Sequence, residues 1–172
     1  MLILFFNFES KYMKIFIILL TFLSFINLSN LFSDELINEF NFSAKTNGLY
    51  NLNDGRKFEA LKLDGHIKNN IGNFGNINCN SLIETKKEEL IFLKVICEIS
   101  LNDGNKIWSV LERNSETYKA GIGNSKIIDG TGKFQKLKGT NCIYAVTKYE
   151  KSSFVVEKCK LTKGLLDKLK SE

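Results

Sequence analysis

The chain contains no proline, only one histidine, and no two cysteines at the short spacing of a metal or redox motif. Structural zinc sites need such cysteine pairs or several histidines, and thiol–disulfide oxidoreductases need a CxxC motif. His66 has no second histidine or nucleophile motif beside it, so a catalytic triad is not indicated and a surface histidine is the simpler interpretation. The sequence therefore predicts no metal site and no cofactor. We attribute the missing proline, together with abundant asparagine, lysine and phenylalanine, to genome composition.

A block of basic residues is also missing. The net charge is +5, from 24 basic and 19 acidic side chains that are interspersed along the chain. Nucleic-acid-binding proteins concentrate basic residues on one face or segment, so no nucleic-acid partner is expected. The run Gly130–Lys133 resembles a phosphate-binding loop only superficially, because the full glycine–lysine spacing and a following helix are not indicated.

The first 33 residues have the layout of a secretory signal peptide. Met13-Lys14 is a short basic start, Ile15 to Phe25 is almost unbroken apolar sequence, and small polar residues lead to Ser33. We expect cleavage after Ser33, with Met13 as a candidate start codon. An uncleaved membrane anchor is the alternative, because the apolar stretch is close to the ~18 residues that can span a bilayer. The sequence predicts a secreted or periplasmic protein with a single domain from Asp34 to Glu172.

The first two cysteines lie symmetrically about a polar turn. A hairpin folded near Lys87 places Cys79 opposite Cys97, and the same register places Ile83 opposite Leu93 on one apolar face. A half-buried antiparallel pair requires such a face, and a slip of one residue would turn it to the wrong side. We therefore predict a β-hairpin that is crosslinked by a Cys79–Cys97 disulfide.

The other two cysteines repeat this arrangement. Cys142 and Cys159 are symmetric about the polar stretch Tyr149–Ser153, and Val146 then faces Val155. Chance readily explains one cysteine pair centred on its own turn, but hardly two. The sequence predicts a second disulfide, Cys142–Cys159, and with it an oxidising compartment.

Extended segments separated by turn signals run through the rest of the chain. Asn53–Gly55, Asp64-Gly65 and Asn102–Asn105 are expected turns, and the segments between them alternate as strands do. This rhythm gives about eight strands, and no long amphipathic helix interrupts them. We predict an all-β domain, an antiparallel barrel of about eight strands with an open sandwich as the alternative. A short C-terminal helix is expected within Thr162–Lys170.

The segment Ile127–Gly139, with the sequence IIDGTGKFQKLKG, resembles an element of the small eight-stranded, calycin-like barrels of the allene oxide cyclase and dirigent type. In those proteins an apolar pair precedes a G-T-G-x-F turn, and another glycine follows before a closing strand. The resemblance implies a secreted barrel without a cofactor, with Phe134 plugging one end. It transfers no catalytic residue, because no second motif aligns, and the two hairpin disulfides depart from the cyclase pattern.

Trp108 and Glu112 are the most suggestive candidates for a ligand site. On a strand they share one face, while Arg113 points to the other. If they line a barrel, they can bind and polarise a small amphipathic molecule, and Tyr118 and Phe134 are further candidates. The alternative interpretation is a core tryptophan followed by a solvated Glu–Arg pair.

Three functions are open on the sequence alone. The first is an exported, non-enzymatic barrel that binds a small apolar or amphipathic ligand, or a protein partner. The second is a cofactor-free isomerase or cyclase acting on a lipid-like substrate, which needs a carboxylate such as Glu112 or Glu98 inside an apolar cavity with a raised pKa. The third is a structural envelope protein, which would have a large exposed apolar patch and no pocket. The sequence does not indicate the oligomeric state.

Overall fold

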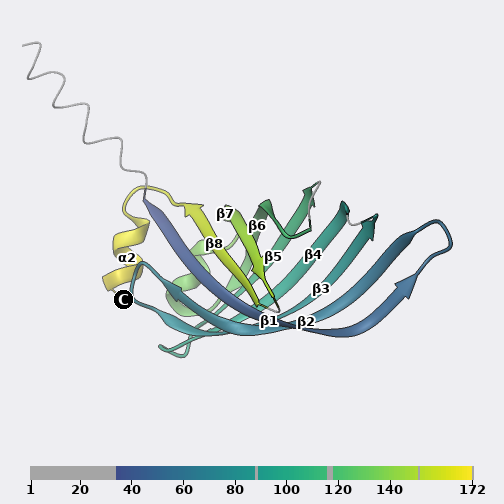
Figure 1. Ribbon diagram of the computed structural model, residues 1–172. Coiled ribbons are helices and arrows are strands. Elements are labelled where there is room, and N and C mark those ends of the chain that lie inside the picture. Colours follow the sequence, from purple (N-terminus) through teal and green to yellow (C-terminus); the bar gives the residue numbers. More distant parts are fainter. Residues whose placement is uncertain (1–33, 88, 116–117, 151, 172) are drawn as a thin grey trace, which may run out of the picture. The chain divides into compact units, whose positions relative to one another are not determined.

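The computed structural model describes residues 34–87, 89–115, 118–150 and 152–171, and the predicted signal peptide lies outside these residues. Asp34–Glu172 is one compact unit, in which eight antiparallel strands close into a barrel in chain order (Figure 1). The closing pair is β1 with β8. The predicted antiparallel barrel is thus confirmed over the open sandwich. The strands are β1 (Glu35–Asn51), β2 (Arg56–Asn69), β3 (Phe74–Lys86), β4 (Glu89–Leu101), β5 (Lys106–Ser115), β6 (Ala120–Gly130), β7 (Asn141–Tyr149) and β8 (Ser152–Lys160).

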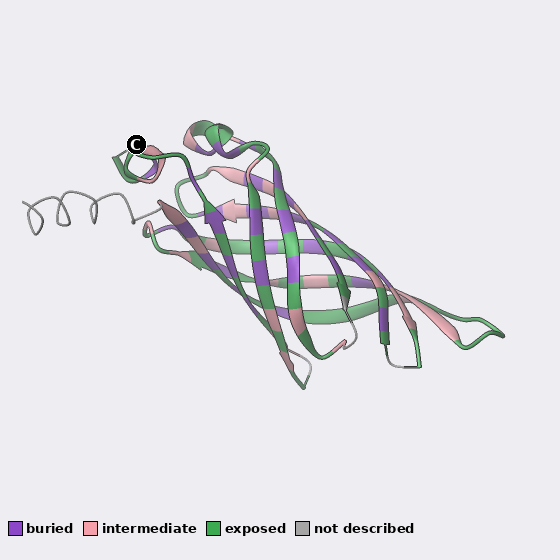
Figure 2. Cartoon of the chain, turned by 90° about the horizontal axis from the view of Figure 1, so that it is seen from above, coloured by how far each residue is buried: buried purple, intermediate pink, exposed green. Residues whose placement is uncertain are grey.

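Alternation of buried and exposed residues gives each strand an inner and an outer face. In β3, for example, Ile77, Cys79, Ser81 and Ile83 are buried, and the residues between them are exposed. The same alternation colours most strands in Figure 2. Side chains project to opposite sides of a strand at a period of two, so this pattern places the apolar residues inside the barrel.

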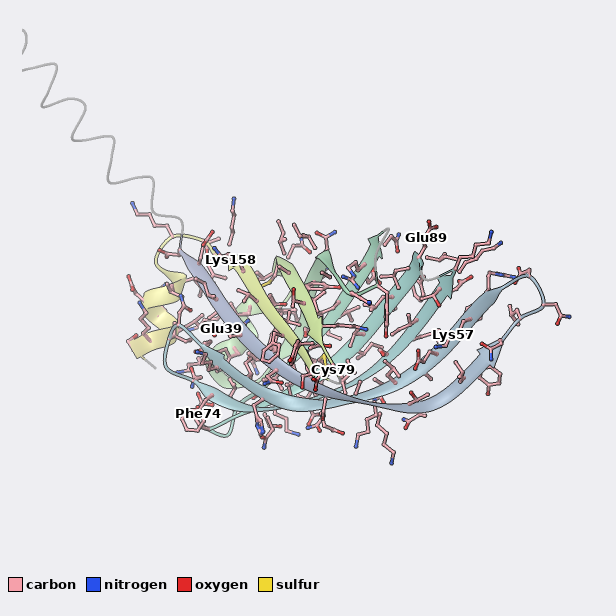
Figure 3. The ribbon with its side chains drawn as sticks, in the orientation of Figure 1. Glu39, Lys57, Phe74, Cys79, Glu89 and Lys158 are labelled. Carbon is pink, nitrogen blue, oxygen red and sulfur yellow. A yellow bond between two sulfur atoms is a disulfide. The ribbon has the colours of Figure 1, made fainter. Side chains whose placement is uncertain are left out.

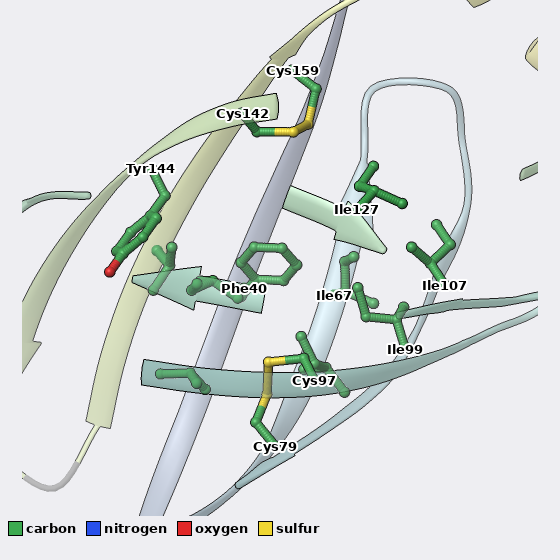
Figure 4. Close-up of a cluster of buried hydrophobic side chains, with 14 of the residues drawn as sticks. Phe40, Ile67, Cys79, Cys97, Ile99, Ile107, Ile127, Cys142, Tyr144 and Cys159 are labelled. Atoms are coloured by element: carbon green, nitrogen blue, oxygen red, sulfur yellow. A yellow bond between two sulfur atoms is a disulfide. The ribbon is translucent and has the colours of Figure 1, made fainter. Parts of the chain in front are cut away.

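Both cysteine-bearing hairpins have the predicted register. Cys79 pairs with Cys97 across β3 and β4, and Cys142 pairs with Cys159 across β7 and β8. The Cα atoms of the two disulfides are 4.1 Å and 4.2 Å apart, and all four cysteines are buried. Figure 4 shows both disulfides among buried side chains that include Phe40. The predicted pairing is confirmed, and it indicates an oxidising environment.

One predicted turn is wrong. Asp64-Gly65 was expected to end a strand, but β2 continues through it to Asn69. A Cβ atom on Gly65 would lie within 3 Å of three backbone atoms of the neighbouring β1, including the Asn41 carbonyl oxygen. Glycine within a strand often marks such a close backbone approach rather than a turn.

Two short helices cover one end of the barrel, which we call the closed end. The 3-10 helix η1 (Gly132–Leu137) joins β6 to β7 and was not predicted. Helix α2 (Leu165–Ser171) follows β8 and corresponds to the short C-terminal helix expected within Thr162–Lys170 (Figures 1 and 2). Phe134, Leu137 and Leu169 are fully buried there. Phe134 therefore fills this end of the barrel. Among the described residues, no helix is long and apolar enough to cross a membrane.

The opposite end, which we call the open end, is formed by the hairpin loops between β1–β2, β3–β4, β5–β6 and β7–β8. In Figure 3, Lys57 and Glu89 lie toward this end, while Phe74 lies at the other end with α2. The β1–β2 hairpin projects beyond the other loops (Figure 1). Among the described residues, no helix covers the open end.

Candidate ligand-binding site

A cavity of about 70 Å³ lies inside the barrel toward the open end. Its lining comes from every strand except β6 and is mainly aliphatic and aromatic. The apolar part includes Phe42, Leu63, Ile83, Val95, Leu111 and Val155, and the polar part is Ser81, Arg113, Tyr144, Lys148 and Ser153. None of these lining residues is acidic. The cavity therefore combines apolar walls with two cationic side chains.

Arg113 is the most unusual residue of the cavity. It extends inward from β5, and only 3% of its surface is exposed. Its Nη2 donates a hydrogen bond to the Tyr118 carbonyl oxygen at 3.1 Å, whereas Nε and Nη1 are buried without any hydrogen-bond partner. Burial lowers the pKa of the guanidinium, which nevertheless stays charged in proteins. A buried charge without an ionic partner carries a desolvation penalty of several kcal/mol.

Lys148 supplies a second positive charge near the same opening. It extends inward from β7, and its Nζ lies 3.1 Å from the centroid of the Tyr118 ring. Burial, assisted by repulsion from Arg113, lowers the pKa of Lys148 to about 8, while Glu59 acts in the opposite direction. The ammonium thus loses its charge just above neutral pH.

Tyr144 lines the cavity because its cross-strand neighbour has no side chain. Tyr144 pairs with Gly123 on β6, and a Cβ atom on Gly123 would lie 2.5 Å from the Tyr144 ring and hydroxyl. Burial raises the pKa of Tyr144 to about 12, so it presents a neutral hydroxyl group. A glycine opposite an aromatic residue therefore shapes the cavity wall.

A buried carboxyl group lies deeper in the barrel. Glu157 on β8 accepts hydrogen bonds from Asn38 Nδ2, at 2.8 Å, and from Ser125 Oγ. Burial raises its pKa, so the neutral acid is favoured. Glu157 does not line the cavity. Its oxygen atoms lie close to the sulfur atoms of Cys142 and Cys159, but the disulfide removes the thiolates that a metal ion would need.

The structure does not bring Trp108 and Glu112 into the cavity. Both lie on the outer face of β5, and the interpretation of them as barrel-lining residues is corrected accordingly. Trp108 Nε1 donates to Glu98 Oε2 at 3.1 Å, and Glu112 forms an ion pair with Lys94 at 2.9 Å. Trp108 and Glu112 face outward, contrary to the prediction, because the residues that alternate with them point into the core. These core-facing residues are Ile107, Ser109 and Leu111.

The other two predicted ligand-binding residues lie outside the cavity lining as well. Tyr118 is half-buried at the open end, where it contacts both Arg113 and Lys148. Phe134 is at the closed end. His66 is exposed on β2, with its Nδ1 3.1 Å from Asn76 Oδ1, and has no catalytic surroundings.

No motif in the sequence marks Arg113, Tyr144 or Lys148 as cavity residues. Arg113 was placed opposite Trp108 on its strand, but the core face was assigned to the tryptophan. Tyr144 and Lys148 share the alternation of Cys142 and Val146 on β7. Extending the predicted hairpin register two residues beyond Val146 would therefore have placed Lys148 inside.

Comparison with known proteins finds no matching family model, no matching curated protein and no matching solved structure.

Proposed function

We propose that this protein is exported and binds a small amphipathic molecule inside its barrel. The apolar cavity, which is closed at one end by η1 and α2 and accessible at the other, is the observation that supports this function best. Small-molecule sites are concave, mainly apolar and equipped with a few polar groups that orient the ligand. The cavity has each of these features.

The free volume limits the size of the ligand. About 70 Å³ is well below the roughly 300–1,000 Å³ of pockets for drug-sized molecules. This space holds a few methylene groups of a slender alkyl chain, so a longer chain requires the lining side chains to move aside. The ligand head group would stay near the open end, where Arg113, Lys148 and Ser153 lie.

An isomerase of the allene oxide cyclase type has less support. The carboxylates considered for such chemistry, Glu98 and Glu112, both lie on the outer surface in ion pairs. Glu98 has a lowered pKa because Lys106 and Trp108 donate hydrogen bonds to it. Glu157 has a raised pKa but no access to the cavity lining, so we propose binding without catalysis.

Export is part of the proposal. Two disulfides indicate an oxidising compartment, and the N-terminal sequence has the layout of a signal peptide. A secreted or periplasmic carrier of a small amphiphile agrees with both features. A purely structural envelope protein was expected to have no pocket, so the cavity favours the carrier.

Blocking the cavity tests the proposal. Val146→Phe adds a ring to the inner face of β7, and Ala145→Phe adds the same ring to the outer face one residue away. Thermal unfolding with octanol and octanoate should show stabilisation of the wild type and of Ala145→Phe, but not of Val146→Phe. Equal stabilisation of both variants, or none of the wild type, would rule out binding in the barrel.

A further inference from the structure

We propose that the ligand is a single-chain amphiphile with an oxyanion head group, such as a carboxylate, and that Arg113 binds this head group with Lys148 beside it. This inference rests on the proposed function and adds the sign and chemistry of the head group.

The first argument is the unsatisfied hydrogen-bonding capacity of Arg113. A guanidinium has five N–H donors and no acceptor, so it can be satisfied only by oxygen or other acceptor atoms. Nε and Nη1 have no partner, although 97% of the residue surface is buried. A buried charge of this kind destabilises a fold unless it is paired. A ligand oxyanion would supply both the missing acceptors and the missing negative charge.

The second argument is the charge balance of the cavity. Its lining contains Arg113 and Lys148 but no acidic residue. The carboxylate that acts on Lys148 from the open end is Glu59, which is already bound by Lys57 at 3.3 Å and by Thr46 Oγ1 at 3.0 Å. An uncompensated positive charge therefore persists inside, and it would attract an anion and repel a cationic amphiphile.

The third argument is the position of the charges relative to the apolar wall. Arg113 lies near the open end of β5, and Leu111 is the next inward-facing residue toward the closed end. Val95 pairs with Leu111 across β4 and β5, and it also lines the cavity. An anion at Arg113 would thus leave its alkyl chain against these side chains.

The test compares eight-carbon ligands that differ only in the head group. Calorimetric titration of the purified protein with octanoate, octanol and octylamine measures the contribution of the charge. We expect octanoate to bind roughly 10- to 100-fold more tightly than octanol, the range for hydrogen bonds to a charged group. Octylamine should bind more weakly than octanol.

Substitution of the arginine provides a matched control, because the chain contains one other arginine. Arg113→Met should reduce octanoate affinity to that of octanol and leave octanol binding unchanged. Arg56 is 40% exposed and pairs with Asp54 and Glu84, so Arg56→Met should leave both affinities unchanged. Without ligand, Arg113→Met should unfold at the same temperature as the wild type or higher, because the substitution removes a buried unpaired charge.

The outcomes separate the two proposals. If octanol binds the wild type as tightly as octanoate, the oxyanion assignment is wrong and the amphiphile proposal stands. If neither binds, both are wrong. If acetate or inorganic phosphate binds as tightly as octanoate, the site is an anion site without a role for the chain. These titrations of the wild type test both proposals even if Arg113→Met fails to fold.

Discussion

At the scale of single residues, Lys148 provides a pH test of the proposed ligand binding. Its pKa of about 8 means that the ammonium loses its proton as pH rises from 7 to 9, while Arg113 and a bound carboxylate stay charged. The pKa of Tyr118 beside it is raised by burial, so this phenol stays neutral in the same range. Positive charge at the head group is therefore lost only from Lys148.

We predict that octanoate affinity falls by roughly 3- to 10-fold as pH rises through this range, a change of about 0.7–1.4 kcal/mol. Calorimetric titration at pH 7, 8, 9 and 10 measures this fall. Lys148→Met should bind octanoate more weakly at pH 7 and show no fall. An equally steep fall in Lys148→Met would assign the titration to another group.

Glu157 makes the stability of the fold depend on pH. Burial raises its pKa in the folded state, so its contribution is complete below pH ~4.5 and is lost as pH rises through the folded-state pKa. Glu157→Gln stays neutral at every pH, and its amide nitrogen can donate to the unpaired Asn38 Oδ1. We predict that the free energy of unfolding of Glu157→Gln, relative to that of the wild type, increases between pH 5 and pH 8. Urea denaturation at several pH values measures this difference. The free energy of unfolding of Glu157→Ala should be about 2–4 kcal/mol lower than that of the wild type at pH 5. A constant difference between Glu157→Gln and the wild type would show that folding does not raise the pKa of Glu157.

At the scale of elements, the two crosslinked hairpins make comparable contributions to stability. The disulfides span 18 and 17 residues, and loops of this length give about 3 kcal/mol each in the chain-entropy model. Replacing Cys79 and Cys97 together by alanine, or Cys142 and Cys159 together, should each lower the free energy of unfolding by about that amount. A reducing agent should destabilise the wild type by more than it destabilises either double variant. Loss of less than 1 kcal/mol in both variants would mean that the crosslinks contribute little.

The β6–β7 pair positions Tyr144 through Gly123. Gly123→Ala would place a methyl group 2.5 Å from the Tyr144 ring, so the ring must move. We predict a lower octanoate affinity with only a modest loss of stability, because the tyrosine ring can rotate away more readily than backbone can shift. Gly48→Ala is the control, since its new methyl group would have only ordinary contacts at 3.7 Å and beyond. Calorimetry of both variants should show a defect only in Gly123→Ala.

At the scale of the whole molecule, the sequence predicted which residues pair across the strands better than it predicted which face of a strand points into the barrel. The cysteine pairs fixed two registers, because a disulfide across a hairpin requires directly opposed residues. The face of β5 could not be fixed in this way. Both faces of β5 carry apolar residues, such as Val110 on the outer face and Leu111 on the inner face. Trp108 led to the prediction that its own face, which is the outer one, points into the barrel. A buried arginine in a cavity breaks the usual apolar pattern, which is why the sequence signal failed at this residue.

Methyl NMR with octanoate shows directly whether the ligand enters the barrel. Titration should shift the methyl signals of Val95, Leu111 and Val146 on the inner face. The exposed methyl groups of Ile122 and Ile143 on the outer face of β6 and β7 should stay unchanged. Shifts confined to Ile122 and Ile143, or no shifts at a saturating concentration, would contradict a ligand site inside this barrel.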